Sequence, residues 1–349
     1  MSSHIQRKVA VVGASGYSGE ELLRLLGSHP SVQVVAVTSR QHPGRQIGEV
    51  LPQFRGHPTL GKSVFIDSQV DQIVASGAEF VFLALPHGLA AEFAEPLLEA
   101  GLRVLDLSAD FRLRDAAIFE EFYGVKHPSP HLLTKAVYGL PEVRRSEIAD
   151  ARLVACPGCY PTSILLPLIP LLRKKLIEPG SIVANSLSGV SGAGRKASID
   201  LLFAECNESV RAYGLPGHRH LSEIEQELSL AAGTALRINF APHLIPINRG
   251  ILTTIHAAPK DDLTLELLTK TFQEAYAQEP FIRLLGPDGF PDVKYVARTN
   301  FIDIAWRLDP RTGRVILLSA EDNLVKGAAG QAIQNFNLLA QLPETTGLL

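Results

Sequence analysis

Two cysteines near the middle of the chain have the neighbours that make a thiol reactive. Cys156 and Cys159 lie in the run Val-Ala-Cys-Pro-Gly-Cys-Tyr-Pro-Thr, residues 154–162, directly before a stretch that is expected to be helical, residues 162–176. A thiolate at the start of a helix is stabilised by the helix dipole and is nucleophilic near neutral pH. The sequence therefore predicts that Cys159 forms a covalent bond to a substrate.

The C-x-x-C spacing has two other interpretations. A redox pair also follows a strand and precedes a helix, so a thiol–disulfide role for Cys156 and Cys159 stays open as a secondary alternative. A metal site would need further ligands, but the chain has no second C-x-x-C and the nearest pair of histidines lies far along the sequence. We therefore expect no metal. Cys206 is typical of a small buried hydrophobic residue.

A pair of histidines is the second candidate for chemistry. His218 and His220 stand in Gly-His-Arg-His-Leu-Ser-Glu, residues 217–223, at the start of a polar helix. A histidine of near-neutral pKa can take a proton from a thiol and later give one to an alkoxide. The pair is therefore predicted to assist the nucleophilic cysteine.

A third motif predicts a phosphate-binding loop. Three glycines at spacing G-x-x-G-x-x-G follow the first expected strand, residues 8–12, and open a helix. Glycines let the backbone turn tightly and approach a pyrophosphate, while the helix N-terminus supplies amide donors. The spacing predicts that a dinucleotide is bound by Gly13, Ser15, Gly16, Tyr17, Ser18 and Gly19.

The end of the second expected strand indicates which dinucleotide. An acidic residue there would bind the ribose 2′-hydroxyl of NAD, but this chain has Thr38, Ser39 and Arg40. Arginine and serine suit a 2′-phosphate, which favours NADP(H). A solvated Arg40 is the alternative. The predicted cofactor-binding set also includes Pro86, which follows the third expected strand, and Ser191 and Gly192.

Two further stretches could bind anions. Residues 186–195 follow a strand and offer backbone amides, hydroxyls and a guanidinium, a plausible anion nest that includes Ser188, Ser191, Gly192 and Arg195. Arg112 follows the fourth expected strand, where doubly wound sheets place their ligands, and could grip a phosphate or a carboxylate. A surface pairing of Arg112 with a nearby aspartate is the alternative.

The spacing of apolar runs predicts two kinds of sheet. Short β-branched runs at 8–12, 32–38, 80–85 and 103–107 alternate with helical stretches such as 89–100, the pattern of a doubly wound parallel sheet. After residue 160 longer strand candidates follow with few helices between them, which predicts an α+β domain with a mostly antiparallel sheet. These candidates are 181–187, 237–244, 250–257, 301–308 and 314–319.

The change from alternating short strands and helices to longer strands suggests domain boundaries. We expect a Rossmann-like, NADP-binding domain over residues 1–157, joined by a last helical segment within 322–349. A catalytic, substrate-binding and dimerisation domain is expected over residues 158–321. The last helix, expected over 324–342, would pack back on the first domain.

Composition limits the class of protein. The chain has 349 residues, of which 46% are hydrophobic and 20% charged, with a formal net charge of −3. Scattered basic residues and negative net charge argue against nucleic-acid binding and favour small-molecule partners. Three cysteines fit a reducing compartment. No signal-peptide pattern precedes residue 8, and the longest apolar run is too short to span a bilayer, so we expect a cytoplasmic protein without membrane contact.

Taken together, these motifs are similar to those of the N-acetyl-γ-glutamyl-phosphate reductases of arginine biosynthesis, over almost the whole chain. The related aspartate-semialdehyde dehydrogenases share fold and chemistry but are not expected to carry Gly-Cys-Tyr-Pro-Thr or Gly-His-Arg-His. The motifs that carry the resemblance are Gly-Ala-Ser-Gly-Tyr-Ser-Gly (13–19), Asp-Leu-Ser-Ala-Asp-Phe-Arg (106–112), Ala-Val-Tyr-Gly-Leu-Pro-Glu (136–142), Pro-Gly-Cys-Tyr-Pro-Thr (157–162), Ser-Gly-Val-Ser-Gly-Ala-Gly-Arg (188–195), Gly-His-Arg-His (217–220) and Asp-Asn-Leu-Val-Lys-Gly-Ala-Ala (322–329).

The resemblance implies roles for single residues. It makes Cys159 the nucleophile and His218 the acid/base, places His220 in the substrate pocket, and places Asn323 near the nicotinamide ring. Where members of the family are expected to carry a polar residue such as Asn, this chain has Cys156. That departure permits the hypothesis that the two cysteines form an inactivating disulfide under oxidation.

The implied reaction is the reduction of an acyl phosphate. The Cys159 thiolate attacks the acyl carbon and expels phosphate, NADPH reduces the resulting thioester, and His218 protonates the oxygen to release the semialdehyde. Arg112 and Arg195 hold the phosphate or the carboxylate of the substrate, and the sequence leaves open which holds which. A homodimer or homotetramer is expected, because an open face of an antiparallel sheet often packs against its own copy.

Two rival functions remain open from the sequence. The same chemistry could act on a carrier-linked aminoadipyl phosphate of lysine biosynthesis, although a basic rim for an acidic carrier protein is not evident. The chain could instead be a non-catalytic NADP-binding redox sensor that uses the C-x-x-C, in which case the paired histidines and the anion nest have no evident purpose.

Overall fold

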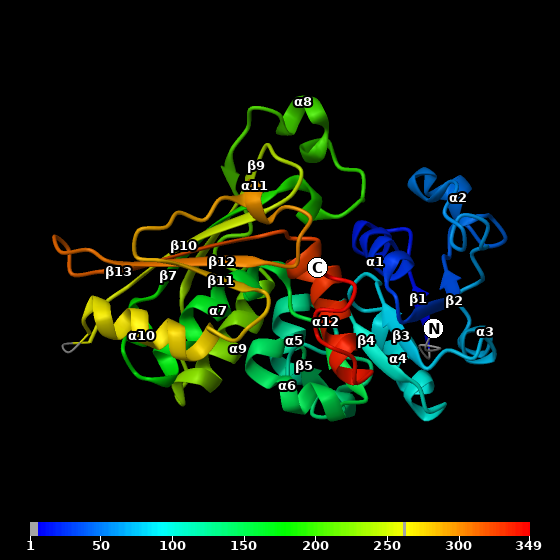
Figure 1. Cartoon of the computed structure of the whole chain (residues 1–349), viewed down its shortest axis with the longest axis horizontal. Coiled ribbons are helices and arrows are strands. Elements are labelled where there is room, and N and C mark those ends of the chain that lie inside the picture. The colour runs from blue at the N-terminus through cyan, green and yellow to red at the C-terminus, as the bar shows by residue number, and fades with distance from the viewer. Residues whose placement is uncertain (1–5, 261–262) are drawn as a thin grey trace. The chain divides into compact units, whose positions relative to one another are not determined.

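The chain divides into two compact units in the computed structural model, which describes residues 6–260 and 263–349 (Figure 1). The first unit consists of Met1–Glu120, Val125–Pro157 and Ala328–Leu349. The second consists of Glu121–Gly124 and Gly158–Gly327.

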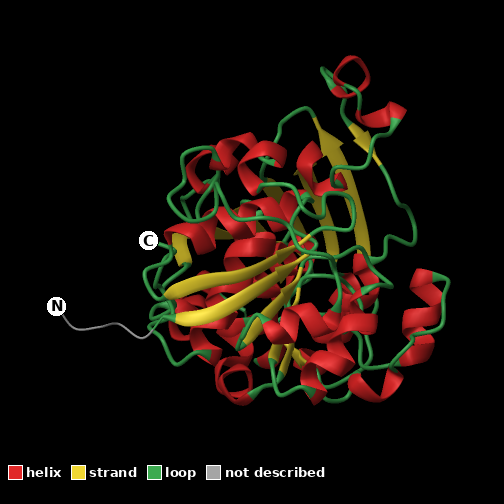
Figure 2. Cartoon of the chain, turned by 90° about the vertical axis from the view of Figure 1, so that its right-hand side faces the viewer, coloured by secondary structure: helices red, strands yellow, loops and turns green. Residues whose placement is uncertain are grey.

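The first unit is built on a parallel sheet of six strands in the order β2-β1-β3-β4-β6-β5, and every pair in it is parallel. In Figure 2 the strands of this sheet run between helices. The strands are β1 (Arg7–Val12), β2 (Val32–Thr38), β3 (Phe80–Leu83), β4 (Arg103–Asp106), β5 (Val137–Tyr138) and β6 (Leu153–Ala155). The helices are α1 (Tyr17–Ser28), α2 (Ile47–Val50), η1 (Pro52–Phe54), α3 (Val70–Ala75), α4 (Ala90–Glu99), α5 (Ala116–Tyr123), η2 (Pro130–Leu132), α6 (Pro141–Asp150) and α12 (Gly330–Leu339).

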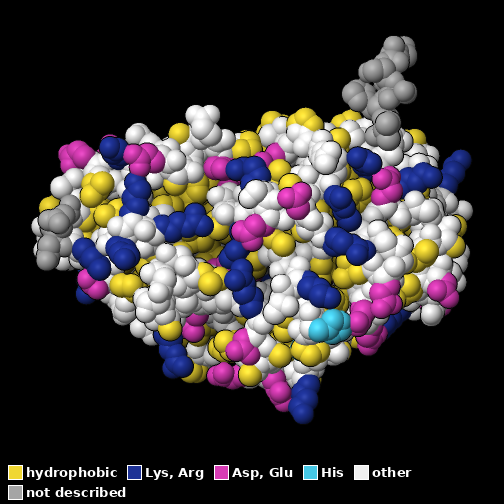
Figure 3. Space-filling model, turned by 90° about the horizontal axis from the view of Figure 1, so that it is seen from below, with side chains coloured by type: hydrophobic (Ala, Val, Ile, Leu, Met, Phe, Trp, Pro, Cys, Tyr) yellow, Lys and Arg dark blue, Asp and Glu magenta, His cyan; other side chains and the backbone are white. Residues whose placement is uncertain are grey.

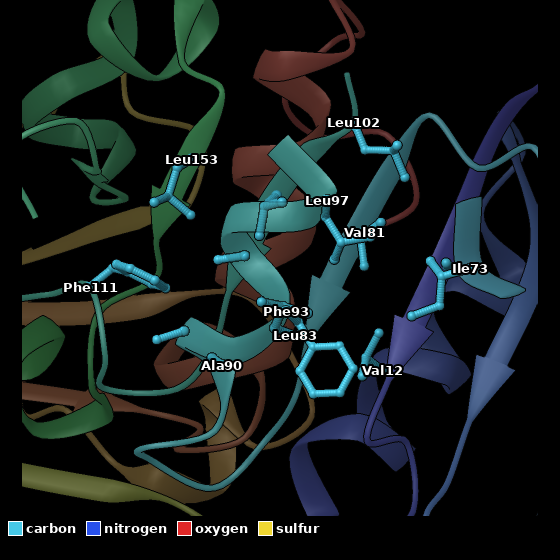
Figure 4. Close-up of a cluster of buried hydrophobic side chains, with 14 of the residues drawn as sticks. Val12, Ile73, Val81, Leu83, Ala90, Phe93, Leu97, Leu102, Phe111 and Leu153 are labelled. Atoms are coloured by element: carbon cyan, nitrogen blue, oxygen red, sulfur yellow. The ribbon is translucent and has the colours of Figure 1, made fainter. Parts of the chain in front are cut away.

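Strand β3 shows why this sheet must be covered on both faces. All four of its residues are buried, and successive side chains of a strand point to opposite faces. Val81 and Leu83 enter a cluster of buried hydrophobic residues that includes Phe93 of α4 (Figure 4). Phe80 and Phe82 point the other way and contact Phe336 of α12, with ring centroids 5.1 and 5.7 Å apart. The predicted doubly wound fold is confirmed.

The second unit contains a seven-stranded sheet in the order β11-β12-β13-β10-β7-β9-β8, with four antiparallel and two parallel pairs. The prediction of a mostly antiparallel sheet is therefore confirmed. The strands are β7 (Val183–Gly189), β8 (Arg211–Ala212), β9 (Asn239–Ile245), β10 (Ile251–Ala257), β11 (Ile282–Gly286), β12 (Ile302–Leu308) and β13 (Val315–Glu321). The helices are α7 (Cys159–Arg173), η3 (Pro179–Ser181), η4 (Val190–Ala193), η5 (Ile199–Leu201), α8 (Phe203–Cys206), α9 (His220–Ala232), α10 (Leu265–Tyr276), α11 (Val293–Val296) and the π-helical turn η6 (Val325–Ala329).

Helix α7 lies at the centre of the second unit. Its residues from Tyr160 to Leu172 are all buried, and it packs on β10 and β13 with α9 and α10 beside it (Figure 1). Hydroxyl groups join the helix to the sheet: Ser163 Oγ lies 2.8 Å from Thr253 Oγ1, and Ser319 Oγ donates to the Ser163 carbonyl at 2.7 Å. These bonds satisfy buried polar groups that would otherwise destabilise the unit.

Several element boundaries differ from the sequence-based expectation. The helix expected from residue 162 begins at Cys159, because Pro161 sits in the first turn, where a missing N–H costs no helical hydrogen bond. The helix expected over 324–342 is a π-helical turn followed by α12. Strands β5, β6, β8 and β11 were not expected. Three of them have only two or three residues, too few to show a periodic pattern.

Surface charge is mixed on the face shown in Figure 3, where basic and acidic side chains alternate with apolar ones. Across residues 6–260 and 263–349, every helix is too short or too polar to cross a membrane.

Candidate active site

The turn before α7 presents the predicted nucleophile. Cys159 is the first residue of the helix, and its thiol belongs to a partly exposed residue. Gly158 is the N-cap residue, with φ −69° and ψ 157°, and it has no side chain to cap the helix. The sulfur therefore stands at the positive end of a 15-residue helix, where the helix dipole stabilises negative charge.

Gly327, in the π-helical turn η6, lies directly against the nucleophile. A Cβ atom built on Gly327 would lie 2.6 Å from Cys159 Cβ, closer than real Cβ contacts allow, and 3.1 Å from its Cα. Only glycine at position 327 leaves Cys159 in place. π-helical turns often occur at functional sites, and this one follows Asn323, another predicted site residue.

The two predicted histidines lie together in an aromatic cluster of the same unit. The rings of His218 and His220 have centroids 4.9 Å apart, and both contact Tyr160, the residue after the nucleophile. His218 also contacts Tyr213 and Phe240 edge to face. His218 Nδ1 accepts a hydrogen bond from the backbone N–H of His220 at 3.1 Å, so the neutral ring carries its proton on Nε2.

Burial controls the protonation of this cluster. Burial, and to a smaller extent Arg219, lowers the pKa of His218 to about 4. Burial raises the pKa of Tyr213 to about 12 and raises that of Tyr160 as well, and their hydroxyl oxygens lie 2.8 Å apart. At neutral pH His218 is therefore a neutral base and both tyrosines remain hydroxyl groups.

A buried carboxylate joins the histidine helix to the nucleophile's turn. Glu223, in the first turn of α9, is 1% exposed, and its Oε1 accepts a hydrogen bond from the Gly158 backbone N–H at 2.8 Å. Sequence reasoning included Glu223 in the histidine motif but assigned it no role. Tyr213 was missed as well, because it lies outside every motif.

The predicted anion nest follows β7. Ser188 is buried, Ser191 and Gly192 lie in the turn η4, and Arg195 is exposed just beyond it. Asn323 holds this turn: its Oδ1 accepts from the Gly250 N–H at 2.8 Å and its Nδ2 donates to Ser191 Oγ at 3.0 Å. The structure thus brings four predicted residues together, Ser188, Ser191, Gly192 and Asn323. A role for Asn323 beside the nicotinamide stays a prediction.

In the first unit, the glycine loop fits a dinucleotide phosphate. Gly13 has φ +83°, and a Cβ there would lie 2.7 Å from the Ala84 carbonyl oxygen. A Cβ on Gly19 would lie 2.7 Å from Ala14 Cα, so the close approach of α1 to the loop that precedes it needs glycine. Gly16, the N-cap of α1, has open space around it and no side-chain cap. A helix start without a side-chain cap, and with room beside its N-cap glycine, suits a pyrophosphate. Ser15, Tyr17 and Ser18 belong to the same loop and helix start.

Three other predicted cofactor-binding residues of this unit lie after β2 and β3. Ser39 is buried and its Oγ accepts from the Gln41 N–H at 3.3 Å. Arg40 is half exposed and pairs with Glu92 at 3.3 Å. Pro86 lies in the loop between β3 and α4. The buried carboxylate of Asp110 accepts hydrogen bonds from the N–H of Gly88 in this loop and from the N–H of Ala91 in the first turn of α4.

Arg112 is more buried than expected. Its Nε donates to the Cys156 carbonyl at 2.8 Å and its Nη2 to the Leu107 carbonyl at 3.0 Å. These bonds connect the ends of β4 and β6. Arg112 is 8% exposed, so it is a buried rather than a solvated arginine. Its contact with substrate stays a prediction.

Cys156 has the environment of an inert thiol. It is 1% exposed, and burial, followed by the charge of Asp106, raises its pKa to about 12. Its sulfur accepts a long contact from Asn335 Nδ2 at 3.7 Å. A thiol that stays protonated and buried attacks disulfides slowly. This environment does not favour the redox interpretation of the C-x-x-C.

Known proteins resemble the chain over nearly its whole length. The family models described as semialdehyde dehydrogenase, NAD binding domain, and semialdehyde dehydrogenase, dimerisation domain, match residues 8–151 and 159–323. A protein from Akkermansia muciniphila named N-acetyl-gamma-glutamyl-phosphate reductase is 60% identical over 343 residues, which cover 98% of this chain and 99% of that protein. A protein of the same name from Geotalea daltonii is 51% identical, with 98% and 97% covered.

Solved structures share the fold at lower identity. Aspartate semialdehyde dehydrogenase II from Vibrio cholerae, in complex with ASA, superposes with a TM-score of 0.72 at 18% identity, over 96% of this chain and 98% of that one. The enzyme from Candida albicans, with NADP, gives 0.71 at 16% identity, with 96% and 98% covered. The chain therefore has the semialdehyde dehydrogenase fold and belongs to the N-acetyl-γ-glutamyl-phosphate reductase family.

Proposed function

We propose that the chain reduces N-acetyl-γ-glutamyl phosphate to N-acetylglutamate 5-semialdehyde with NADPH, a step of arginine biosynthesis. The main support is the geometry of the site in a chain that is 60% identical to a reductase of that name. A partly exposed cysteine begins a buried helix, and the next residue, Tyr160, contacts the histidine cluster. This is the environment that acyl transfer to sulfur requires.

The first half of the reaction forms a thioester. Neutral His218 takes the proton of the Cys159 thiol, which the helix N-terminus already favours losing. The sulfur bonds to the acyl carbon as the carbon–oxygen bond to phosphate breaks, and the thiol proton leaves with the phosphate as hydrogen phosphate. Arg112 and Arg195 are the proposed cations for the phosphate and the carboxylate of the substrate.

The second half reduces the thioester. The residues Gly13, Ser15, Gly16, Tyr17, Ser18 and Gly19 would hold the dinucleotide, which supplies a hydride to the acyl carbon when bound. Neutral His218 relays one proton from solvent to the oxygen as that oxygen gains negative charge. Breakage of the carbon–sulfur bond then moves the hydroxyl proton to sulfur, and the semialdehyde leaves with Cys159 restored as a thiol.

Mass spectrometry tests this function directly. Enzyme mixed with N-acetyl-γ-glutamyl phosphate and no NADPH is expected to gain the mass of one N-acetylglutamyl group, less the displaced hydrogen, on the peptide that contains Cys159. Addition of NADPH should remove the adduct and release semialdehyde. An unmodified Cys159 peptide, in enzyme that turns over when NADPH is present, would rule out the covalent route.

The two rival functions make different predictions. An enzyme for carrier-linked aminoadipyl phosphate would prefer that substrate when both are assayed side by side. A redox sensor would show no phosphate-dependent oxidation of the semialdehyde with NADP⁺. The names of the relatives and the buried Cys156 thiol support the reductase over both.

We expect a preference for NADPH that depends on Arg40. The guanidinium is half exposed and its weak surface pair with Glu92 can be exchanged for a 2′-phosphate. Arg40→Ala is expected to lower kcat/KM for NADPH by about 10-fold and to leave that for NADH nearly unchanged. The measurement is the ratio of kcat/KM for NADPH to kcat/KM for NADH in the wild type and in Arg40→Ala. An equal loss of kcat/KM with NADPH and with NADH would place Arg40 outside the 2′-phosphate site. Arg45→Ala is the control, because it removes a nearby surface cation.

We also propose a homodimer or homotetramer. One face of the seven-stranded sheet is covered by α7, but the opposite face carries the partly exposed side chains of Leu187, Leu252 and Leu318. The match to a dimerisation domain over residues 159–323 supports a copy of the chain as the cover. Light scattering is expected to give the mass of two or four chains, and the mass of one chain at micromolar concentration would contradict the proposal.

A further inference from the structure

We propose that Glu223 is a positioning residue that locks the turn of the Cys159 nucleophile to the helix that begins at the histidine pair. The inference rests on the proposed function for its catalytic consequence, but its geometry is independent of it. The carboxylate does not have to contact substrate to act in this way.

The burial of Glu223 requires an explanation. A carboxylate that is 1% exposed loses nearly all its hydration, so it is kept in a fold only where hydrogen bonds compensate. Glu223 Oε1 accepts the Gly158 N–H at 2.8 Å across 65 residues of sequence. Its place in the first turn of α9 is also favoured by the dipole of that helix.

The bond fixes the residue directly before the nucleophile. Gly158 is held on its N–H by Glu223, and its carbonyl accepts from both the N–H and the Oγ1 of Thr162 at 3.2 Å. Both peptide units that flank Gly158 are therefore held in place. Since glycine has no side chain to restrict its backbone, these three hydrogen bonds define the direction in which Cys159 leaves the turn.

The other end of the connection is the acid/base cluster. Glu223 lies three residues after His220 and five after His218, and α9 is a continuous helix of 13 residues from His220. One carboxylate thus couples the position of the sulfur to the position of the imidazoles. Ring contacts of Tyr160 with His218 and His220 join the same two segments.

The geometry uses the carboxylate as a hydrogen-bond acceptor, and this makes the role separable from charge. A glutamine at position 223 has the same shape and also offers an acceptor oxygen. It would keep the turn in place while it removes a negative charge near the thiolate. Alanine would remove the acceptor and leave the Gly158 N–H buried without it.

The test compares Glu223→Ala, Glu223→Gln and the control Glu227→Ala. Glu227 lies one turn further along α9, is 3% exposed, and accepts from Gln226 Nε2 at 3.0 Å, so it controls for loss of a buried carboxylate from the same helix. We expect Glu223→Ala to lower kcat by about 10- to 100-fold with a smaller change in KM, because misplacement of a reacting group acts on the transition state. Glu223→Gln and Glu227→Ala should stay within about 3-fold of the wild-type kcat.

Two further readouts separate positioning from other roles. The rate of Cys159 alkylation by iodoacetamide is expected to fall in Glu223→Ala and to be retained in Glu223→Gln, and the pH profile of Glu223→Gln should match that of the wild type. If Glu223→Gln and Glu223→Ala lose kcat equally, or if the pH profile of Glu223→Gln lacks a limb of the wild-type profile, the charge of Glu223 acts and the proposal is overturned. Wild-type kcat in a folded Glu223→Ala would show that the hydrogen bond is dispensable, which also overturns it.

The design also distinguishes this inference from the proposed function. Absence of turnover in the wild-type protein with N-acetyl-γ-glutamyl phosphate would refute the function, whereas the alkylation rates need no substrate and still test the position of Cys159. If Glu223→Ala does not fold, as judged by circular dichroism, the Glu223→Gln comparison alone decides between acceptor and charge.

Discussion

Replacement of Cys159 by serine is expected to lower turnover with N-acetyl-γ-glutamyl phosphate by roughly 10³-fold or more. A serine hydroxyl does not ionise near neutral pH, and the helix N-terminus that favours a thiolate cannot overcome that difference. An oxygen ester, if formed, is also a poorer hydride acceptor than a thioester. The measurement is the steady-state rate of NADPH oxidation, together with the adduct mass on the residue-159 peptide.

Binding should separate chemistry from folding in this variant. The glycine loop belongs to the first unit and the nucleophile to the second, so the dissociation constant for NADPH is expected to change by less than about 2-fold. Cys206→Ser is the matched control, because Cys206 lies in the short helix α8 and is not one of the predicted site residues. Turnover within about 10-fold of wild type in Cys159→Ser would exclude the sulfur as the obligatory nucleophile.

Replacement of His218 by glutamine is expected to lower kcat by roughly 10²- to 10⁴-fold, the range of a lost acid/base. Glutamine keeps a polar side chain of similar size but does not act as an acid or a base near neutral pH. His220→Gln is the comparison, since that ring lies in the same aromatic cluster and is expected to affect KM more than kcat. The opposite order of the two kcat losses would assign the acid/base role to His220.

The pH dependence of the wild type adds an independent measurement. Because burial lowers the pKa of His218 to about 4, the ring remains a base well below its ordinary value of 6.5. The value of kcat/KM should therefore hold between pH 7 and about 5 and fall as the pH approaches about 4. A limb near 6.5 would contradict the buried environment of this ring.

The same shift has a defined effect on stability. A histidine whose folded pKa lies below its unfolded value stabilises the fold fully above pH 6.5, and the contribution is lost as the pH falls from 6.5 toward about 4. Circular dichroism at each pH measures the folded fraction, so a fall in rate caused by unfolding can be distinguished from one caused by protonation of His218.

Local sequence carried most of the information on chemistry and fold class. The glycine spacing after a strand, the cysteine before a helix and the paired histidines each lie within seven to nine consecutive residues, so their meaning does not depend on distant contacts. The alternation of short apolar runs predicted the parallel sheet for the same reason. The short strands β5, β6 and β8 were missed because strands of two or three residues show no period, and the start of α7 was displaced because Pro161 hid the first helical turn.

Packing between distant segments decided what surrounds the predicted residues. Glu223 meets Gly158 across 65 residues, Asn323 meets Gly250 across 73, and Gly327 leaves room for Cys159. None of these contacts has a local pattern, since each depends on how helices pack on a completed sheet. Burial, a property of the whole fold, likewise distinguished two cysteines of the same motif: Cys159 remains partly exposed at a helix start, and Cys156 is an enclosed thiol with a raised pKa.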